Sequence, residues 1–199
     1  MTRIKLCGLK RIEDIQTVNQ LLPDYIGFVF AQKSKRYVSP VQAAELKSSL
    51  DPEIAAVGVF VNEKPEKVAE LLNKDIIDLA QLHGSEDEAY IHRLRSLTYK
   101  PLIKALRVKD KSDLDAAENC SADYILLDAG AGDGLTFDWS ILQGFSRPYF
   151  LAGGLDPSNV KSAIEELSPY AVDVSSGIET DGFKDAAKMK AFVDAVRYR

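Results

Sequence analysis

The stretch Ile4-Lys5-Leu6-Cys7-Gly8-Leu9 predicts a buried strand that ends in a tight turn, and it decides which fold the chain adopts. Strand side chains alternate between the two faces of a sheet, so Lys5 and Cys7 share one face, opposite to Leu6. A helical pattern follows directly after Gly8. An open, doubly wound sheet would be expected to carry a glycine fingerprint at this turn, and the stretch has none. The first strand and helix therefore argue against that fold.

Strand-like runs and helical patterns alternate along the rest of the chain. Further strands are expected at residues 25–30, 55–61, 78–84, 101–107, 124–128, 148–152 and 171–174. Helical stretches are expected at residues 13–22, 39–50, 62–73, from 85 onward, 112–119, from 137 onward, from 156 onward, and 185–197. Asn62 is expected to cap the third of these helices, and the acidic side chains of residues 85–88 suit the positive end of the fourth.

This alternation determines the predicted fold class. Strands that alternate with helices form parallel sheets. Eight such units predict closure into a (β/α)8 barrel, the TIM barrel. We therefore predict an α/β fold with one domain that covers residues 1–199, because no linker, domain-sized repeat or low-complexity segment interrupts the pattern.

Length and composition narrow the class of protein. The 199 residues suit one domain with a sizeable core, and the net charge of −5 argues against a nucleic-acid or anionic-membrane partner. No apolar run is long enough to span a membrane, and no signal peptide is expected. Two cysteines, Cys7 and Cys120, give no disulfide framework, so a cytoplasmic protein is expected, with Cys120 structural. The two histidines, His83 and His92, lack the spacing of a zinc site, and no metal is expected.

Polar residues gather where the expected strands end, while the strand interiors are apolar. In a (β/α)8 barrel these ends meet at one rim, which carries the active site. The rim residues are Cys7, Arg36, His83, Asp128, Gly153-Gly154 and Ser175-Ser176-Gly177. The last two turns follow the seventh and eighth strands, where such barrels bind phosphate, and their glycines let backbone N–H groups approach an anion. We therefore predict a phosphate site at these two turns.

Position alone leaves the chemistry of the other rim residues open. Cys7 is either a small buried hydrophobe or a reactive thiol, whose thiolate Lys5 would favour. Asp128 either pins the glycine-rich loop after it or faces Cys7 as one member of a general acid–base pair. Arg36 is either a solvated cation or a fork for a ligand carboxylate. His83 suits a structural rim residue better than a catalyst.

Several motifs at the strand ends add a further signal. They are Lys5-Leu6-Cys7-Gly8-Leu9, Gly27-Phe28-Val29-Phe30, Ser34-Lys35-Arg36, Val57-Gly58-Val59-Phe60, Gln81-Leu82-His83-Gly84, Leu126-Leu127-Asp128, Phe137-Asp138-Trp139, Leu151-Ala152-Gly153-Gly154-Leu155 and Asp173-Val174-Ser175-Ser176-Gly177-Ile178-Glu179. In this order, over nearly the whole chain, they resemble the phosphoribosylanthranilate isomerase family of tryptophan biosynthesis. One loop departs from that family: Gly132-Asp133-Gly134-Leu135 stands where a Gly-Thr/Ser-Gly step and a basic residue are common.

The resemblance implies a barrel enzyme that carries out an Amadori rearrangement of N-(5'-phosphoribosyl)anthranilate to 1-(2-carboxyphenylamino)-1-deoxy-D-ribulose 5-phosphate, with no cofactor. It implies that Asp128 is the general acid that protonates the ribose ring oxygen. It also implies that Cys7 is the base that removes the proton from C2'. The iminium ion formed on ring opening makes this C–H acidic, so a thiolate of moderate basicity is enough, whereas the acid needs a raised pKa to stay protonated.

The resemblance also implies binding roles and leaves two alternatives. Arg36 is expected to bind the anthranilate carboxylate of a small-molecule phosphosugar–anthranilate substrate, in a protein that is a monomer or homodimer. One alternative is a phosphosugar isomerase of the histidine-pathway type, a family that has a pair of aspartates where this chain has Cys7 and Asp128. The other is a barrel that binds a sugar phosphate without turning it over. The remaining implied contacts are His83 and Asp173 with the substrate, and Gly153, Gly154, Ser176 and Gly177 with its phosphate.

Overall fold

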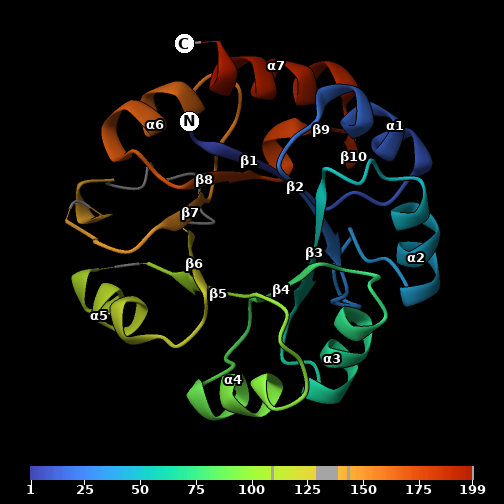
Figure 1. The fold of residues 1–199 in the computed structure, drawn as a ribbon. Coiled ribbons are helices and arrows are strands. Elements are labelled where there is room, and N and C mark those ends of the chain that lie inside the picture. Colours follow the sequence, from blue (N-terminus) through green and yellow to red (C-terminus); the bar gives the residue numbers. More distant parts are fainter. Residues whose placement is uncertain (109, 129–138, 143, 199) are drawn as a thin grey trace.

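Eight parallel strands form a closed barrel in the computed structural model, which describes residues 1–108, 110–128, 139–142 and 144–198 (Figure 1). The strands are β1 (Arg3–Cys7), β2 (Tyr25–Val29), β3 (Ala55–Phe60), β4 (Leu79–Leu82), β5 (Leu102–Arg107), β6 (Tyr124–Asp128), β7 (Tyr149–Ala152) and β8 (Ala171–Val174). Each strand pairs with the next in the chain, and β8 returns to β1, where Lys5 stands opposite Asp173. The predicted (β/α)8 fold is confirmed.

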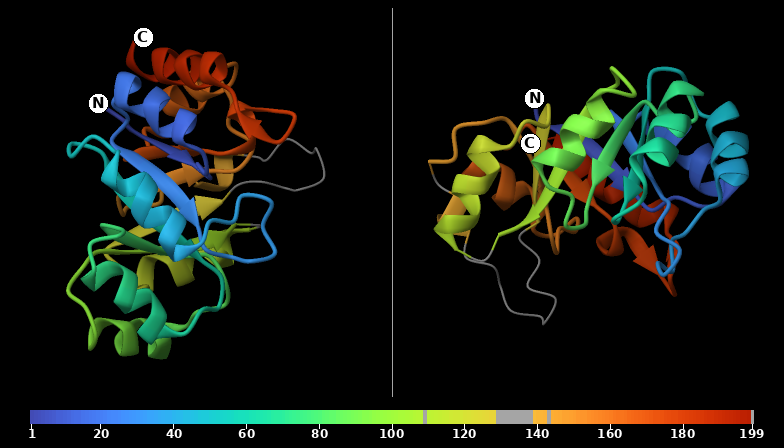
Figure 2. Two further views of the ribbon diagram at one scale, coloured as in Figure 1. Left: turned by 90° about the vertical axis from the view of Figure 1, so that its right-hand side faces the viewer. Right: turned by 90° about the horizontal axis from the view of Figure 1, so that it is seen from below.

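Seven α-helices cover the outside of the barrel within the described residues (Figures 1 and 2). They are α1 (Ile12–Leu21), α2 (Pro40–Ser48), α3 (Pro65–Asn73), α4 (Glu88–Arg95), α5 (Lys111–Asn119), α6 (Val160–Leu167) and α7 (Ala186–Arg197). Where a helix was expected after β6, a short 3₁₀ turn, η1 (Trp139–Leu142), begins; residues 137 and 138 of the expected helix lie outside the described part. So does the atypical loop at residues 132–135.

Between β8 and α7 the chain forms a small substructure that the sequence did not predict. A 3₁₀ turn, η2 (Ser176–Ile178), is followed by a hairpin of two short antiparallel strands, β9 (Glu179–Thr180) and β10 (Phe183–Lys184). The hairpin and the loop after β2 project on the same side of the barrel, beyond the carboxyl ends of the strands (Figure 2). This substructure therefore lies where it can contribute side chains to the rim.

Aromatic and aliphatic side chains fill the amino-terminal end of the barrel. The rings of Tyr25, Tyr124 and Tyr170 surround Phe150, with centroids 5.3, 5.9 and 5.6 Å from its own. Tyr25 and Tyr124 open β2 and β6, and Tyr170 directly precedes β8. Such rings bury a large apolar area each. The interior is therefore packed at this end, and its polar side chains gather toward the other.

The loop after β3 shows that the expected helix cap at Asn62 was wrong. Asn62 adopts a left-handed conformation with φ 53°, and Pro65 opens α3 directly after Lys64. The side-chain oxygen of Asn62 accepts hydrogen bonds from the backbone N–H of Ser85 at 2.8 Å and from its hydroxyl at 3.0 Å. Asn62 thus joins two neighbouring loops instead of capping a helix.

The acidic run before α4 meets the expectation in part: Asp87 caps the helix and Glu88 lies in its first turn, whereas Glu86 does not face the helix end. Asp87 caps this helix by accepting a hydrogen bond from the backbone N–H of Tyr90 at 2.9 Å. Glu86 instead turns inward, where it pairs with Lys104 of β5 at 2.9 Å and accepts the backbone N–H of Asn62 at 2.7 Å. A buried cation on β5 needs a partner of opposite charge, and Glu86 supplies it.

The helix after β7 likewise begins later than expected. Asp156 accepts hydrogen bonds from the backbone N–H groups of Ser158 at 2.7 Å and Asn159 at 3.2 Å, which makes a turn, and α6 starts only at Val160. The last helix begins as predicted, with the Asp185 side chain as its cap. Within the described residues, every helix falls short of the length or the apolar character needed to cross a bilayer.

Candidate active site

A pocket of about 310 Å³ lies at the carboxyl-terminal ends of the barrel strands. Seven of the eight strands, all except β5, contribute a lining residue. Gly177 is the predicted site residue that stays outside the lining. The structure therefore brings the other predicted residues together at one rim: Cys7, Arg36, His83, Asp128, Gly153, Gly154, Asp173 and Ser176.

Cys7 ends β1 in an enclosed position, with 7% of its surface exposed. Gly27 of β2 is its partner in the parallel pairing, and a Cβ atom at Gly27 would come within 2.6 Å of the Cys7 Sγ. The absence of a side chain there makes room for the thiol. Burial raises the pKa of the Cys7 thiol above its ordinary value, while the ammonium groups of Lys5 and Lys184 oppose this rise and Asp173 adds to it.

Lys5 is completely buried inside the barrel, on the same strand face as Cys7. Its Nζ atom donates hydrogen bonds to Asp173 Oδ1 at 3.0 Å and to Gln81 Oε1 at 2.8 Å. Burial alone would lower the pKa of Lys5, but the charges and hydrogen bonds of Asp173 and Cys7 outweigh it, and the pKa is raised. Lys5 therefore stays a cation that favours the thiolate of Cys7, although burial of the thiol has the larger effect.

Asp128 and His83 form the more open side of the pocket. Asp128 ends β6, and its Oδ2 atom lies 3.6 Å from Nε2 of His83, which directly follows β4. The two side chains are 24% and 38% exposed. Gln81, two residues before His83, places its Nε2 atom 2.9 Å from the His83 Nδ1 atom. Both rim residues also line an adjoining hollow of about 330 Å³, together with Arg107 at the end of β5.

Arg36 is held at the rim by a carboxylate from the β9–β10 hairpin. Its Nε and Nη2 atoms donate to the two oxygens of Glu179 at 2.6 and 2.8 Å. Lys184 donates to the same carboxylate at 2.7 Å and to the backbone oxygen of Ser175 at 2.8 Å. Burial would raise the pKa of Glu179, but the hydrogen bonds and charges of these two cations lower it to about 2. Glu179 therefore stays ionised and orients the Arg36 fork.

The two turns predicted to bind phosphate lie against each other. Gly153 and Gly154 adopt left-handed conformations, with φ 96° and 66°, which side chains disfavour. A Cβ atom at Gly177 would come within 2.1 Å of the backbone oxygen of Leu155. Gly177 thus lets the turn after β8 pack on the turn after β7, and Ser176 lines the pocket beside it. This packing gives Gly177 a structural reason to be glycine without contact to the pocket.

Sequence reasoning gave no role to three side chains of this site. Gln81 could have been found, because side-chain alternation along β4 puts it on the same face as His83. Glu179 ends one of the family motifs, which gave it no role. Lys184 carries no comparable signal, because the strands of its hairpin have two residues each and show no periodicity.

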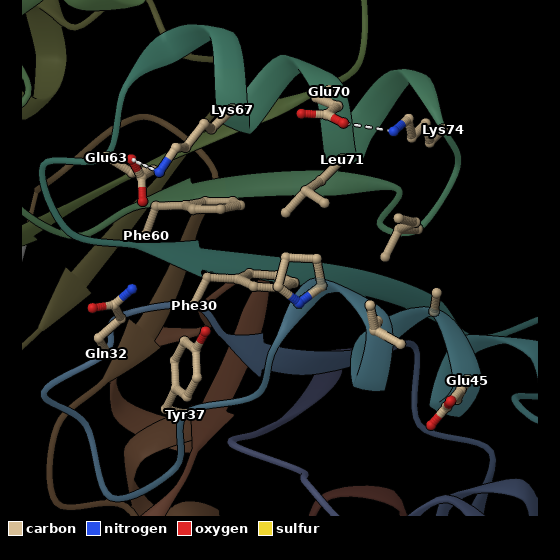
Figure 3. Close-up of a pocket in the computed structure, with 14 residues that line it drawn as sticks. Phe30, Gln32, Tyr37, Glu45, Phe60, Glu63, Lys67, Glu70, Leu71 and Lys74 are labelled. Atoms are coloured by element: carbon tan, nitrogen blue, oxygen red, sulfur yellow. Dashed lines mark hydrogen bonds and ion pairs between the residues drawn. The ribbon is translucent and has the colours of Figure 1, made fainter.

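A larger groove, of about 590 Å³, lies outside the barrel between α2 and α3 (Figure 3). Phe30 and Phe60 stack in its wall with ring centroids 5.0 Å apart. Along α3 the charges at its rim pair with one another, as Glu70 does with Lys74 at 2.5 Å. None of the predicted site residues lines this groove. The convergence of reactive groups, rather than size, therefore identifies the smaller pocket as the candidate active site.

Among the residues that the structure describes, no cluster of three His, Cys, Asp or Glu side chains could hold a metal ion.

A closed barrel with its polar pocket at the carboxyl ends of the strands defines a (β/α)8-barrel enzyme. The family model for N-(5'phosphoribosyl)anthranilate (PRA) isomerase matches residues 4–195. The chain therefore belongs to the N-(5'-phosphoribosyl)anthranilate isomerase family, as the motifs at its strand ends indicated.

Individual relatives and solved structures agree with this membership. The N-(5'-phosphoribosyl)anthranilate isomerase of Thermoanaerobacter sp. (strain X514) is 47% identical over 207 residues, which cover 99% of this chain and 98% of that protein. The crystal structure of phosphoribosyl anthranilate isomerase from Thermotoga maritima matches with a TM-score of 0.92 and 38% identity over 100% of both chains. A phosphoribosyl anthranilate isomerase in complex with reduced 1-(O-carboxyphenylamino)-1-deoxyribulose 5-phosphate matches with a TM-score of 0.89 and 38% identity, also over 100% of both chains.

Proposed function

We propose that this protein catalyses the Amadori rearrangement of N-(5'-phosphoribosyl)anthranilate to 1-(2-carboxyphenylamino)-1-deoxy-D-ribulose 5-phosphate in tryptophan biosynthesis. Membership of the isomerase family supports the reaction. The observation that carries it to this chain is that Cys7 and Asp128 line one pocket together with the turns after β7 and β8. One bound substrate can therefore meet a thiol, a carboxyl group and backbone suited to an anion.

In the proposed mechanism Asp128 acts first, as the general acid. Its carboxyl group gives a proton to the ribose ring oxygen, and the bond between this oxygen and C1' breaks. The nitrogen lone pair moves into the bond to C1', so the anthranilate nitrogen becomes part of an iminium ion. A carboxyl group suits this role when its proton is still bound near the working pH.

Cys7 acts second, as the general base. Its thiolate takes the proton from C2', the C–H electron pair forms the C1'–C2' double bond, and the iminium pair returns to nitrogen. The resulting enolamine tautomerises to the ketone. The cations Lys5 and Lys184 support the thiolate, whereas burial favours the thiol. Turnover should therefore rise as the pH rises through the raised pKa of Cys7.

The substrate contacts are part of the same proposal. Arg36 binds the anthranilate carboxylate, since Glu179 pairs with its Nε and Nη2 atoms and no other described side chain pairs with its Nη1 amino group. His83 and Asp173 contact the substrate from the pocket wall. The phosphate is bound at the two glycine turns by Gly153, Gly154 and Ser176, while Gly177, which was expected to join them, lies outside the pocket lining and packs the two turns together.

The experiment that tests this function follows the fluorescence of freshly made phosphoribosylanthranilate. Wild-type protein should remove the signal quickly. Cys7→Ser keeps the size of the side chain but loses its basicity, so kcat should fall by about 10²–10⁴-fold. Cys120→Ser, which makes the same change outside the pocket, should turn over normally. No decay with folded wild-type protein would refute the proposed reaction, and normal turnover by Cys7→Ser would remove this residue from the mechanism.

The histidine-pathway substrate is the second compound to test. In enzymes of that type a pair of aspartates is expected at the site, whereas this chain has Cys7 in place of one of them. We expect the protein to prefer the anthranilate substrate.

We also propose one catalytic domain over residues 1–199, with no nucleic-acid partner. We propose a monomer or a homodimer, and the pocket formed by the described residues of one chain suits either. A cytoplasmic location is part of the proposal, supported by two free thiols, Cys7 and Cys120.

A further inference from the structure

A continuous line of polar side chains crosses the barrel and joins the two reactive sides of the pocket. Lys5 Nζ lies 3.0 Å from Asp173 Oδ1 and 2.8 Å from Gln81 Oε1. Gln81 Nε2 lies 2.9 Å from His83 Nδ1, and His83 Nε2 lies 3.6 Å from Asp128 Oδ2. Lys5 and Gln81 are 0% and 1% exposed, so neither can replace its partners with bulk water. The arrangement is therefore fixed by the side chains themselves.

The chemistry of Lys5 decides the direction of each hydrogen bond in this line. An ammonium group has donors and no acceptor, so the Gln81 atom that faces it is the carbonyl oxygen. The amide nitrogen of Gln81 then faces His83. Because an amide nitrogen only donates, Nδ1 of the ring accepts. A neutral imidazole has one N–H group, so a ring that accepts at Nδ1 carries its hydrogen on Nε2, toward Asp128.

We infer that Lys5 and Gln81 are positioning residues that hold His83 in the Nε2–H tautomer, so that this N–H stabilises the Asp128 carboxylate left behind when the acid gives its proton to the substrate. The tautomer stands independently of catalysis, whereas its effect on turnover rests on the proposed function. His83 keeps its own proton throughout. Its hydrogen bond forms as the negative charge appears on Asp128.

The 3.6 Å separation fits this role. Hydrogen bonds to an ionised carboxylate are shorter, about 2.7–2.9 Å, and catalytic hydrogen bonds often tighten only when substrate reacts. A protonated Asp128 gains little from a neighbouring donor, but the carboxylate gains much. An interaction that strengthens as the reaction proceeds raises kcat rather than substrate affinity. Loss of the donor should therefore appear in kcat, with KM little changed.

The tautomer can be measured directly by long-range ¹⁵N–¹H correlation NMR on the full chain, at a pH where the ring is neutral. The chain has two histidines, His83 and His92, so the spectrum has two ring systems. His92 is exposed on α4, and His92→Gln identifies the signals of His83. Wild-type protein should show an unprotonated Nδ1 and a protonated Nε2 for His83. The opposite pattern would overturn the inference without any variant in the pocket.

Two substitutions of Gln81 then test its cause. Gln81→Glu keeps the shape and can still face Lys5, but its second oxygen accepts a hydrogen, so His83 should switch to the Nδ1–H tautomer. Gln81→Met keeps the volume and removes the constraint, so both tautomers should be populated. Gln20→Glu makes the same charge change on the exposed face of α1 and should leave the ring unchanged. An unchanged tautomer in both Gln81 variants would show that Gln81 does not set it.

The kinetic arm separates this inference from the proposed function. With N-(5'-phosphoribosyl)anthranilate, Gln81→Glu should lower kcat by about 10- to 100-fold, the scale seen when a positioning partner is lost, and leave KM near the wild-type value. The control variant Gln20→Glu should keep both constants near wild type. If the wild-type protein lacks isomerase activity, the proposed function fails and the tautomer result still stands. If wild type is active and Gln81→Glu reverses the tautomer without slowing turnover, the stabilising role of His83 is refuted.

Discussion

The two sides of the pocket hold their reactive groups in opposite ways. Cys7 is enclosed, 7% exposed, and lies near a fully buried cation, Lys5. Asp128 and its neighbour His83 are 24% and 38% exposed at the side chain. Burial therefore has the largest effect on the pKa of the thiol, whereas solvent reaches the carboxyl group.

This difference indicates how one rim supports an acid and a base at once. On the enclosed side, cations oppose a large desolvation effect, so the charge of the thiolate depends on fixed partners. On the open side, the carboxyl group can exchange its proton with water between turnovers. The two groups thus lie in different surroundings, which is the pattern expected of an acid–base pair with separate roles.

Removal of the acid on the open side should have the largest effect. Asp128→Asn cannot give a proton to the ring oxygen, so kcat should fall by at least about 10²–10⁴-fold while KM changes little. Steady-state kinetics with fresh substrate measures this. Asp115→Asn, an equivalent change on the exposed surface of α5, is the matched control. Wild-type turnover in Asp128→Asn would mean that another group supplies the proton.

Removal of the Arg36 guanidinium group should have a smaller effect, and this effect should be on ligand affinity rather than on kcat. Arg36→Ala should weaken binding of the reduced product analogue by about 10- to 100-fold, the scale of a lost hydrogen bond to a charged group. Arg36→Lys keeps the charge but loses the planar guanidinium group, so its affinity for the analogue should lie between those of wild type and Arg36→Ala. Isothermal calorimetry gives the Kd values. Equal affinity of all three proteins would place the anthranilate carboxylate elsewhere in the pocket.

The smallest effect should come from Glu179, through stability in acid. Its pKa falls from 4.5 in the unfolded chain to about 2 in the folded protein. Because the folded value is depressed, its contribution is complete above pH 4.5 and is lost as the pH falls toward 2. Glu179→Gln should therefore lose less stability than wild type between pH 7 and pH 3. Urea unfolding at both pH values tests this, and parallel losses in the two proteins would contradict it.

Local sequence patterns predicted the barrel and the strand ends of the site. Residues 124–128 and 171–174 match β6 and β8 as observed, because apolar runs between turn signals need only local information. Cys7 and Asp128 were found the same way, as the polar ends of two such runs. The alternation of strand and helix was enough to place these two residues at the rim, whereas their catalytic roles were implied only by the family motifs.

Contacts between distant parts of the chain were not predictable in this way. Asn62 looked like a helix cap, but Ser85 and Glu86 hold it in a left-handed turn. Glu86 looked like one acid of a helix start, but a buried lysine on β5 draws it inward. The partner of Arg36 comes from a hairpin far along the chain, at Glu179. In each case a long-range charge or hydrogen bond overrides the local preference.

The titration of Cys7 tests the central claim, that a buried thiolate is the base, most directly. In a Cys120→Ser background, the rate of alkylation by iodoacetamide and the kcat/KM of the isomerase reaction would be measured over the same pH range. We predict that both rise together, with a midpoint above the ordinary pKa of a cysteine thiol, because burial disfavours the charge. A midpoint at or below the ordinary value, or a kcat/KM that ignores the titration of Cys7, would contradict the account.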